Sequence, residues 1–150
     1  MLDPNSIHVK EEEDMVLRYV LVSVGSGILF GLLDGFIHAN PLARRLYKVF
    51  DPIARTSINV PAGLAIDLVY GFALAGGFLL LEGSLPGATG LLKGLVFGGL
   101  VWFARVVMQV ASQWMMFKVP VKSLLYTLAA GLVEMGILGL LYGLFLHTVT

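Results

Sequence analysis

The chain alternates between long apolar stretches and short polar connections. Residues 15–38, 61–82, 90–116 and 122–147 are rich in Leu, Val, Ala, Gly and Phe and lack the strict alternation typical of strands. Each stretch approaches or exceeds the roughly 20 residues that a helix needs to cross the hydrocarbon of a bilayer. Because a backbone in lipid must satisfy its own hydrogen bonds, we predict an all-α membrane protein, a bundle of four transmembrane helices.

Prolines separate these stretches. A proline in the first turn of a helix loses no helical hydrogen bond, so we expect Pro61 and Pro120 to open the second and fourth helices. The breaks between stretches fall at Asn40-Pro41, Val60-Pro61, Leu85-Pro86-Gly87 and Val119-Pro120.

The first 14 residues are acidic. They include three consecutive glutamates, Glu11 to Glu13, and only one basic residue, Lys10. A secretory signal would begin with a basic segment and end at a small-residue cleavage site. We therefore expect an acidic N-terminal tail over 1–14, kept in the mature protein, and a single transmembrane domain over 15–150.

Composition supports the membrane prediction. Hydrophobic residues make up 57% of the chain and charged residues 13%, against about 25% charged in soluble domains. One small core could not bury that much apolar surface, so the bilayer is the expected partner. The formal net charge is zero and gives no sign of a nucleic-acid partner. The absence of cysteine excludes disulfides and thiolate metal sites.

Basic residues predict the orientation. They concentrate in the first and third connections, and basic loops remain in the cytoplasm. The sequence therefore predicts a multi-pass protein of the cell (inner) membrane with both termini outside the cytoplasm. The residues concerned are Arg44, Arg45, Lys48 and Arg55 in the first connection and Lys118 and Lys122 in the third.

The first connection has a helical pattern of its own. Leu42, Leu46, Val49 and Ile53 recur at roughly helical spacing. Asn40 can cap such a helix and Pro41 can open it, whereas Pro52 must end or bend it. We expect a short amphipathic helix on the inner leaflet, with Arg44, Arg45, Lys48 and Arg55 contacting anionic lipid headgroups. A solvated basic loop is the alternative.

The order of elements suggests an internal repeat. Helix, basic connection and helix occur twice, and a Val-Pro pair opens the second helix each time, at Val60-Pro61 and Val119-Pro120. Two repeated helical hairpins of the same orientation would follow from a duplication. A simple four-span topology would give the same order.

Glycines recur at helical spacing within the stretches. Small residues three or four apart let helix backbones approach closely, which is how helices associate in lipid. The two interpretations are packing inside one bundle and association of several chains into a homo-oligomer. The packing glycines are Gly27, Gly31, Gly35, Gly71, Gly94, Gly98, Gly139 and Gly143.

Four ionisable residues lie inside the predicted spans. Such groups are costly in lipid and usually face the bundle interior with a partner. At about 1.5 Å per residue, Arg105 and Glu134 both lie roughly 18 Å from the cytoplasmic ends of their helices. Asp34 and Asp67 lie roughly 7–9 Å from that side. We therefore predict a buried Arg105–Glu134 ion pair with two carboxylates closer to the cytoplasm.

A polar stripe extends from Arg105. Gln109, Ser112 and Gln113 follow it at spacings that place all four on one helix face. With Asp34 and Asp67 they would line a vestibule open to the cytoplasm, whereas the outer half offers only weakly polar residues such as Ser23 and Ser26.

Each charged group also has a purely structural interpretation. The Arg105–Glu134 pair would fix helix register, and the two aspartates would pair with basic residues of the first connection. Glu82 and Lys93 are expected to be solvated charges at the outer rim.

Catalytic and metal-binding patterns are weak. His38 is predicted at the cytoplasmic end, and His8 and His147 lie outside, so no two are placed to hold a haem between spans. No serine or cysteine nucleophile lies near a histidine in an identifiable arrangement. We therefore expect no metal, no cofactor and no enzymatic activity.

The second half carries a run of packing glycines and aromatic residues. It starts at Leu85-Pro86-Gly87 and passes through Lys93-Gly94-Leu95, Phe97-Gly98 and Trp102-Phe103 to Arg105, with Gly131-Leu132-Val133-Glu134 following later. This run resembles small uncharacterised four-helix integral membrane proteins of bacteria. The resemblance implies the four-helix topology and no activity.

Three functions remain open. The first is a non-catalytic bundle, either a structural, accessory or assembly subunit of a larger membrane complex or a small homo-oligomer. The second is a transporter or channel for a proton, an ion or a small solute that uses Asp34, Asp67, Arg105 and Glu134. The third is a membrane enzyme or cofactor carrier.

Overall fold

The described residues are helical almost throughout. The computed structural model describes residues 4–54, 57 and 59–147, and no strand occurs among them. In chain order the α-helices are α1 (Pro4–Ala39), α2 (Pro41–Leu46), α3 (Val60–Leu81), α4 (Gly90–Val101), α5 (Met108–Met116) and α6 (Val121–Phe145). The 3₁₀-helices are η1 (Tyr47–Ile53) and η2 (Glu82–Ser84), and η3 (Trp102–Val107) is a π-helical segment that joins α4 to α5.

Four helical segments are long and apolar enough to cross a membrane. They are Glu12–Ala39, Val60–Ser84, Gly90–Met116 and Val121–Phe145. Each overlaps one of the four stretches expected from hydropathy, so the prediction of four such helices is confirmed.

Local chemistry explains where the helices begin. The side-chain oxygens of Asn40, Asn59 and Thr89 each accept a hydrogen bond from the backbone N–H three residues on, at 2.9, 3.1 and 3.3 Å. These caps satisfy donors that have no partner within the helix. Pro61 lies in the first turn of α3, and Pro120 immediately precedes α6.

The acidic N-terminal segment is helical from Pro4 onwards. Residues 4–14 are continuous with the rest of α1. Glutamate is a good helix former, so Glu11 to Glu13 suit the interior of a helix.

The first connection contains two short helices instead of one. Helix α2 ends at Leu46, and η1 carries the chain on past Pro52. Leu42, Val49 and Ile53 are exposed, and Leu46 is half-buried.

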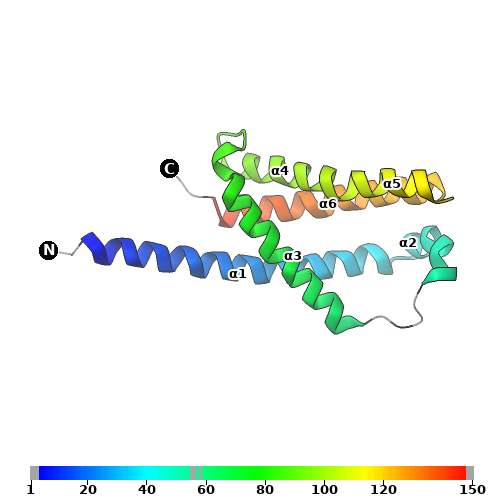
Figure 1. The fold of residues 1–150 in the computed structure, drawn as a ribbon, viewed down its shortest axis with the longest axis horizontal. Coiled ribbons are helices and arrows are strands. Elements are labelled where there is room, and N and C mark those ends of the chain that lie inside the picture. Colours follow the sequence, from blue (N-terminus) through cyan, green and yellow to red (C-terminus); the bar gives the residue numbers. More distant parts are fainter. Residues whose placement is uncertain (1–3, 55–56, 58, 148–150) are drawn as a thin grey trace.

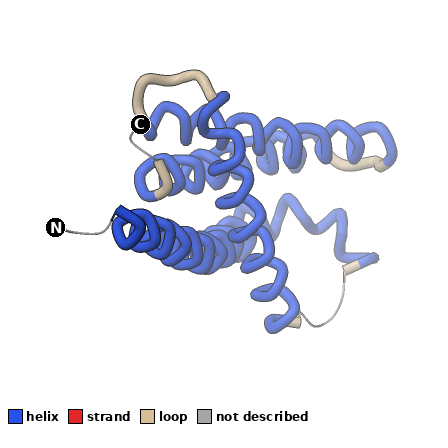
Figure 2. The backbone as a smooth tube through the Cα atoms, turned by 60° about the vertical axis from the view of Figure 1, so that its left-hand side comes forward, coloured by secondary structure: helices blue, strands red, loops and turns tan. Residues whose placement is uncertain are grey.

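The four long helices pack mainly as two pairs. Helix α3 crosses α1 diagonally, whereas the continuous helix formed by α4, η3 and α5 runs alongside α6 (Figure 1). The rotated view shows the same crossing and the same side-by-side pair (Figure 2). Helix α1 also contacts α6, which joins the pairs. The two pairs thus have different geometry, and the duplication stays a prediction.

Glycines make the closest contacts within each pair. A Cβ on Gly27 would lie 2.9 Å from the Asp67 carbonyl oxygen, and a Cβ on Gly71 would collide with the Ser23 carbonyl oxygen. A Cβ on Gly31 would lie 2.6 Å from a carboxylate oxygen of Asp67. These contacts fix the point at which α1 and α3 cross.

The α4–α6 contact is built from facing glycines. A Cβ on Gly94 would collide with the Gly139 carbonyl oxygen, and one on Gly143 with the carbonyl oxygen of Gly90. One on Gly98 would collide with the carbonyl oxygen of Met135. Gly35 takes no part in such packing, because nothing lies within 4 Å of where its Cβ would stand.

Candidate functional site

Arg105 lies in the π-helical segment η3 and packs against two aromatic rings. Its guanidinium carbon is 4.7 Å from the ring centroid of Phe30 on α1 and 4.5 Å from that of Tyr70 on α3. The ring faces attract the cation. Within the described part of the chain, the guanidinium makes neither a hydrogen bond nor a direct ion pair.

Glu134 lies on α6 and is almost completely buried, with 6% of its surface exposed. Its Oε1 atom has no hydrogen-bond partner among the described residues. An unpartnered buried carboxylate oxygen is energetically expensive. The burial of Glu134 without a partner for Oε1 therefore calls for a physical reason.

Arg105 and Glu134 line one cavity of about 300 Å³. Asp34 and His38 on α1, Tyr47 on η1, Gln109 on α5 and Thr127 on α6 also line it. The charge of Arg105 acts on the carboxylates of Asp34, Asp67 and Glu134. The cavity therefore combines one guanidinium, two carboxylates and the imidazole of His38 within a segment of apolar helices.

The predicted direct Arg105–Glu134 ion pair is not formed. The two residues share the cavity, but the guanidinium packs on the rings of Phe30 and Tyr70.

The two aspartates occupy different positions. Asp34 pairs with His38 one turn later, at 3.1 Å between Oδ1 and Nδ1. The Asp67 carboxylate lies against Gly31 and is not among the residues that line the cavity. Neither aspartate pairs with Arg44 or Arg45 among the described residues.

Only part of the predicted polar stripe reaches the cavity. Gln109 lines it, and Gln113 lines an adjoining hollow of about 410 Å³. The Ser112 hydroxyl instead donates to the Met108 carbonyl oxygen within its own helix, at 2.9 Å. The vestibule predicted from sequence thus includes Asp34, Gln109 and Gln113 but not Asp67 or Ser112.

Hydrogen bonds attach the first connection to α6. The Ser123 hydroxyl donates to the Leu46 carbonyl oxygen at 2.7 Å. The Tyr126 hydroxyl donates to the Ile37 carbonyl oxygen, also at 2.7 Å. The Asn40 amide donates to the Tyr126 hydroxyl at 2.7 Å. Together these bonds hold α2 and η1 beside the cavity.

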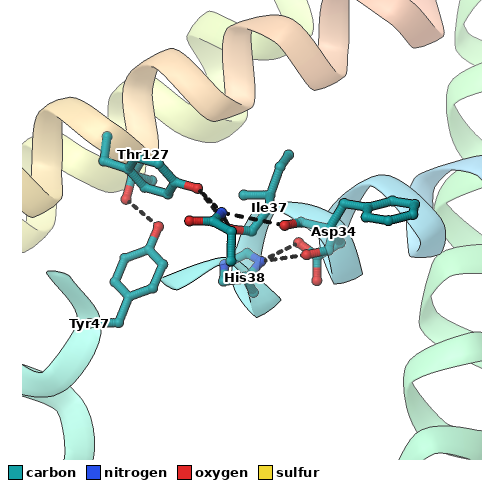
Figure 3. A network of polar contacts seen from close by, with 8 residues as sticks. Asp34, Ile37, His38, Tyr47 and Thr127 are labelled. Carbon is teal, nitrogen blue, oxygen red and sulfur yellow. Dashed lines mark hydrogen bonds and ion pairs between the residues drawn. The ribbon is translucent and has the colours of Figure 1, made fainter. Parts of the chain in front are cut away.

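Tyr47 on η1 lines the cavity and contacts α6. Its hydroxyl lies 3.0 Å from Thr127 Oγ1, and a dashed line marks this contact in Figure 3. Because Thr127 donates its own proton to the Ser123 carbonyl oxygen, Tyr47 is the donor. Burial raises the pKa of the Tyr47 hydroxyl above its ordinary value. The Tyr47 ring also stacks on His38, with centroids 5.3 Å apart.

The cavity and the adjoining hollow form one polar region. They share His38, Tyr47, Gln109 and Thr127. The hollow then extends to Phe50 on η1 and Gln113 on α5. The polar region thus runs from Arg105 and Glu134 towards the first connection.

The described basic residues of the first connection make no ion pair with Asp34 or Asp67. Arg44, Arg45 and Lys48 are exposed on α2 and η1. Arg55 lies outside the described residues.

Glu82 is not a solvated rim charge, contrary to expectation. It is 5% exposed, and its carboxylate contacts the imidazole Nδ1 of His147 beyond the end of α6. The end of α6 lies beside η2, so that Glu82 is buried and His147 is half-buried, a long-range contact that hydropathy could not indicate.

Several residues of the site were not identified from the sequence. The four-residue spacing of Asp34 and His38 was a usable signal for their pairing. Thr127 lies two turns before Glu134 on the same face of α6, which also could have been read. No sequence signal pointed to Phe30 and Tyr70, because they come from different helices.

The site offers hydrogen-bonding groups of both kinds. It offers guanidinium donors, carboxylate acceptors and hydroxyls in a confined space, and no group of three or more metal-ligating side chains is found in the described residues. Comparisons with protein-family models, with curated proteins and with solved structures gave no match. The geometry of the site therefore carries the functional argument alone.

Proposed function

We propose that the chain is a non-catalytic, multi-pass protein of the cell (inner) membrane. Many large apolar side chains face outward, including Leu80, Ile53 and Phe36 with 86, 80 and 76% of their surface exposed. A water-soluble monomer rarely exposes so large an apolar surface. Acyl chains would cover it, in keeping with the four long apolar helices.

Within the membrane, the proposed activity is transport of a small polar solute or an ion. The observation that carries this proposal is the shared cavity of Arg105 and Glu134, in which neither group has a direct ionic partner. Ionisable groups inside spans are expensive and commonly mark a substrate or ion path. A purely structural ion pair would bring the two groups into contact.

Buried hydroxyls in the other half of the bundle support the same function. Ser23 and Ser26 on α1 and Tyr142 on α6 are almost completely buried, with at most 1% of their surface exposed. The Ser23 hydroxyl oxygen has no hydrogen-bond partner among the described residues, and the Ser26 hydroxyl donates to the Ser23 carbonyl oxygen at 3.0 Å. These hydroxyls extend the polar interior from Glu134 towards the end of the bundle where both chain termini lie (Figure 1).

The basic first connection sets the proposed orientation. Arg44, Arg45 and Lys48 are exposed, and they would lie at the cytoplasmic headgroups with the polar region opening beside them. Both termini would then lie outside the cytoplasm.

Transport is testable in liposomes that contain the purified protein. Uptake of radiolabelled sodium, chloride and glycine would be measured, with entrapped pyranine to report protons. We expect at least one species to enter faster than in protein-free liposomes. Arg105→Gln and Glu134→Gln should each slow it about tenfold or more, the loss typical of a charged hydrogen bond.

Matched substitutions outside the cavity provide the control. Arg18→Gln and Glu13→Gln remove the same charges from exposed positions on α1 and should leave uptake unchanged. If the folded protein accelerates none of the four species, the transport proposal is wrong.

The second candidate function is a structural or assembly subunit of a membrane complex, or a homo-oligomer. It is favoured by glycines that no part of the chain covers. Nothing lies within 4 Å of a Cβ built on Gly35 of α1 or Gly63 of α3, so another helix could approach closely there. A folded protein without transport would favour this candidate.

A further inference from the structure

The cavity contains hydrogen-bonding groups of opposite kind that the chain leaves without direct partners. A guanidinium carries five N–H donors and no acceptor, and an ionised carboxylate accepts only. One side of the Arg105 guanidinium packs on Phe30 and Tyr70, and no hydrogen bond to it is formed within the described residues. Glu134 Oε1 is likewise buried and without a partner in the same residues.

The charges of the cavity restrict what could satisfy both groups. A small anion would pair with Arg105 but would face the unpaired carboxylate of Glu134, whereas the Asp34 carboxylate in the same space is paired with His38. A small cation would pair with the carboxylates but would be repelled by Arg105. A molecule with a carboxylate at one end and an ammonium at the other meets both requirements.

The dimensions of the cavity limit the length of such a molecule. About 300 Å³ is at the lower end of the range for small-molecule sites. Tyr47 and Thr127 contribute hydroxyls to the wall, and the Asp34–His38 pair lies where the cavity meets the adjoining hollow. A small zwitterion fits this combination of volume and polarity.

Resting on the proposed transport function, we propose that the cavity binds a small zwitterion of the amino-acid type, with its carboxylate on Arg105 and its ammonium group on Glu134. Bidentate pairing of a guanidinium with a carboxylate is among the strongest charge-assisted contacts. Burial strengthens both contacts, because the surrounding apolar helices lower the local dielectric.

The test is binding to the purified full-length protein by titration calorimetry. The probes are glycine, β-alanine and 4-aminobutyrate, with propionate and propylammonium as analogues that carry one charge. We expect one of the three zwitterions to bind about tenfold or more tightly than either analogue, because each analogue leaves one cavity charge unpaired.

Substitutions assign the two ends of the ligand. Glu134→Gln should remove the preference for the zwitterion over propionate, and Arg105→Gln its preference over propylammonium. Arg18→Gln and Glu13→Gln should retain the zwitterion affinity. Gel filtration and circular dichroism would show that each variant is folded. For a variant that does not fold, the ligand comparison in the unsubstituted protein decides.

The outcomes separate this inference from the transport proposal. Preferred binding of propionate or propylammonium, or no binding of any zwitterion while sodium, chloride or protons still cross the liposome membrane, would overturn the zwitterion assignment alone. Absence of both binding and uptake would overturn both proposals.

Discussion

Arg105 illustrates how a single charge is accommodated among apolar helices. Its guanidinium is held by the faces of Phe30 and Tyr70, not by an acid, which leaves its N–H donors without protein acceptors in the described residues. Guanidinium is more weakly hydrated than ammonium and stacks well on aromatic faces, so lysine would be a poor replacement.

The ring contact should contribute measurably to stability. Tyr70→Leu removes the ring and should lower the free energy of unfolding by about 1–2 kcal/mol, the range for a largely desolvated cation–π contact. Tyr70→Phe keeps the ring and is the matched control, with a change well below that of the leucine variant. Unfolding in a denaturing detergent, followed by circular dichroism, measures both. Equal losses would show that the ring does not hold Arg105.

At the scale of the helices, glycine faces determine the pairing. Gly94 and Gly98 on α4 contact the backbone of α6 at Gly139 and Met135. Gly99 follows Gly98 in the sequence, and Gly136 follows Met135. Both have open space where a Cβ would stand. Glycine thus occurs on both sides of these helices. Only a glycine on the side that faces the partner helix brings the two backbones into close contact.

Adjacent glycines give a direct test of this contact. Gly98→Ala should destabilise the protein by about 1–3 kcal/mol, because its Cβ would overpack against backbone that cannot move aside. Gly99→Ala should be neutral or stabilising, because alanine is the better helix former and has room. Thermal unfolding of the two variants under identical detergent conditions measures the difference. Similar effects from both would contradict the α4–α6 packing.

At the scale of the whole molecule, the chain has polar and apolar regions that suit a bilayer. Both termini lie at one end, and α2 lies at the other (Figure 1). The exposed basic residues of α2 and η1 are at the same end as the polar hollow. In the proposed orientation that end faces the cytoplasm.

Cysteine labelling can test the orientation cleanly, because the chain has no cysteine. Asp51→Cys on η1 and Ser84→Cys on η2 would each introduce a single exposed thiol without removing a basic residue. A membrane-impermeant maleimide added to intact spheroplasts should label Ser84→Cys. It should label Asp51→Cys only after permeabilisation. The reverse pattern would show that the termini face the cytoplasm.

The sequence predicted the number, composition and approximate ends of the long helices, as well as the residues that cap α2. These properties depend on residues close together in the chain. Hydropathy averages over a single segment, and Asn40 caps α2 through a backbone group only three residues away. The same local signals missed the helical start of α1 at Pro4, because acidic residues lower hydropathy without preventing a helix.

The tertiary structure alone decided which groups meet. Depth along the helices placed Arg105 and Glu134 at the same level, but the crossing of α3 over α1 put Tyr70 beside Phe30 and gave Arg105 its rings. Local sequence patterns also did not indicate the π-helical segment, nor the contact of His147, beyond the end of α6, with Glu82. Contact between side chains on different helices depends on crossing geometry and rotation about each helix axis, and spacing along one segment contains neither.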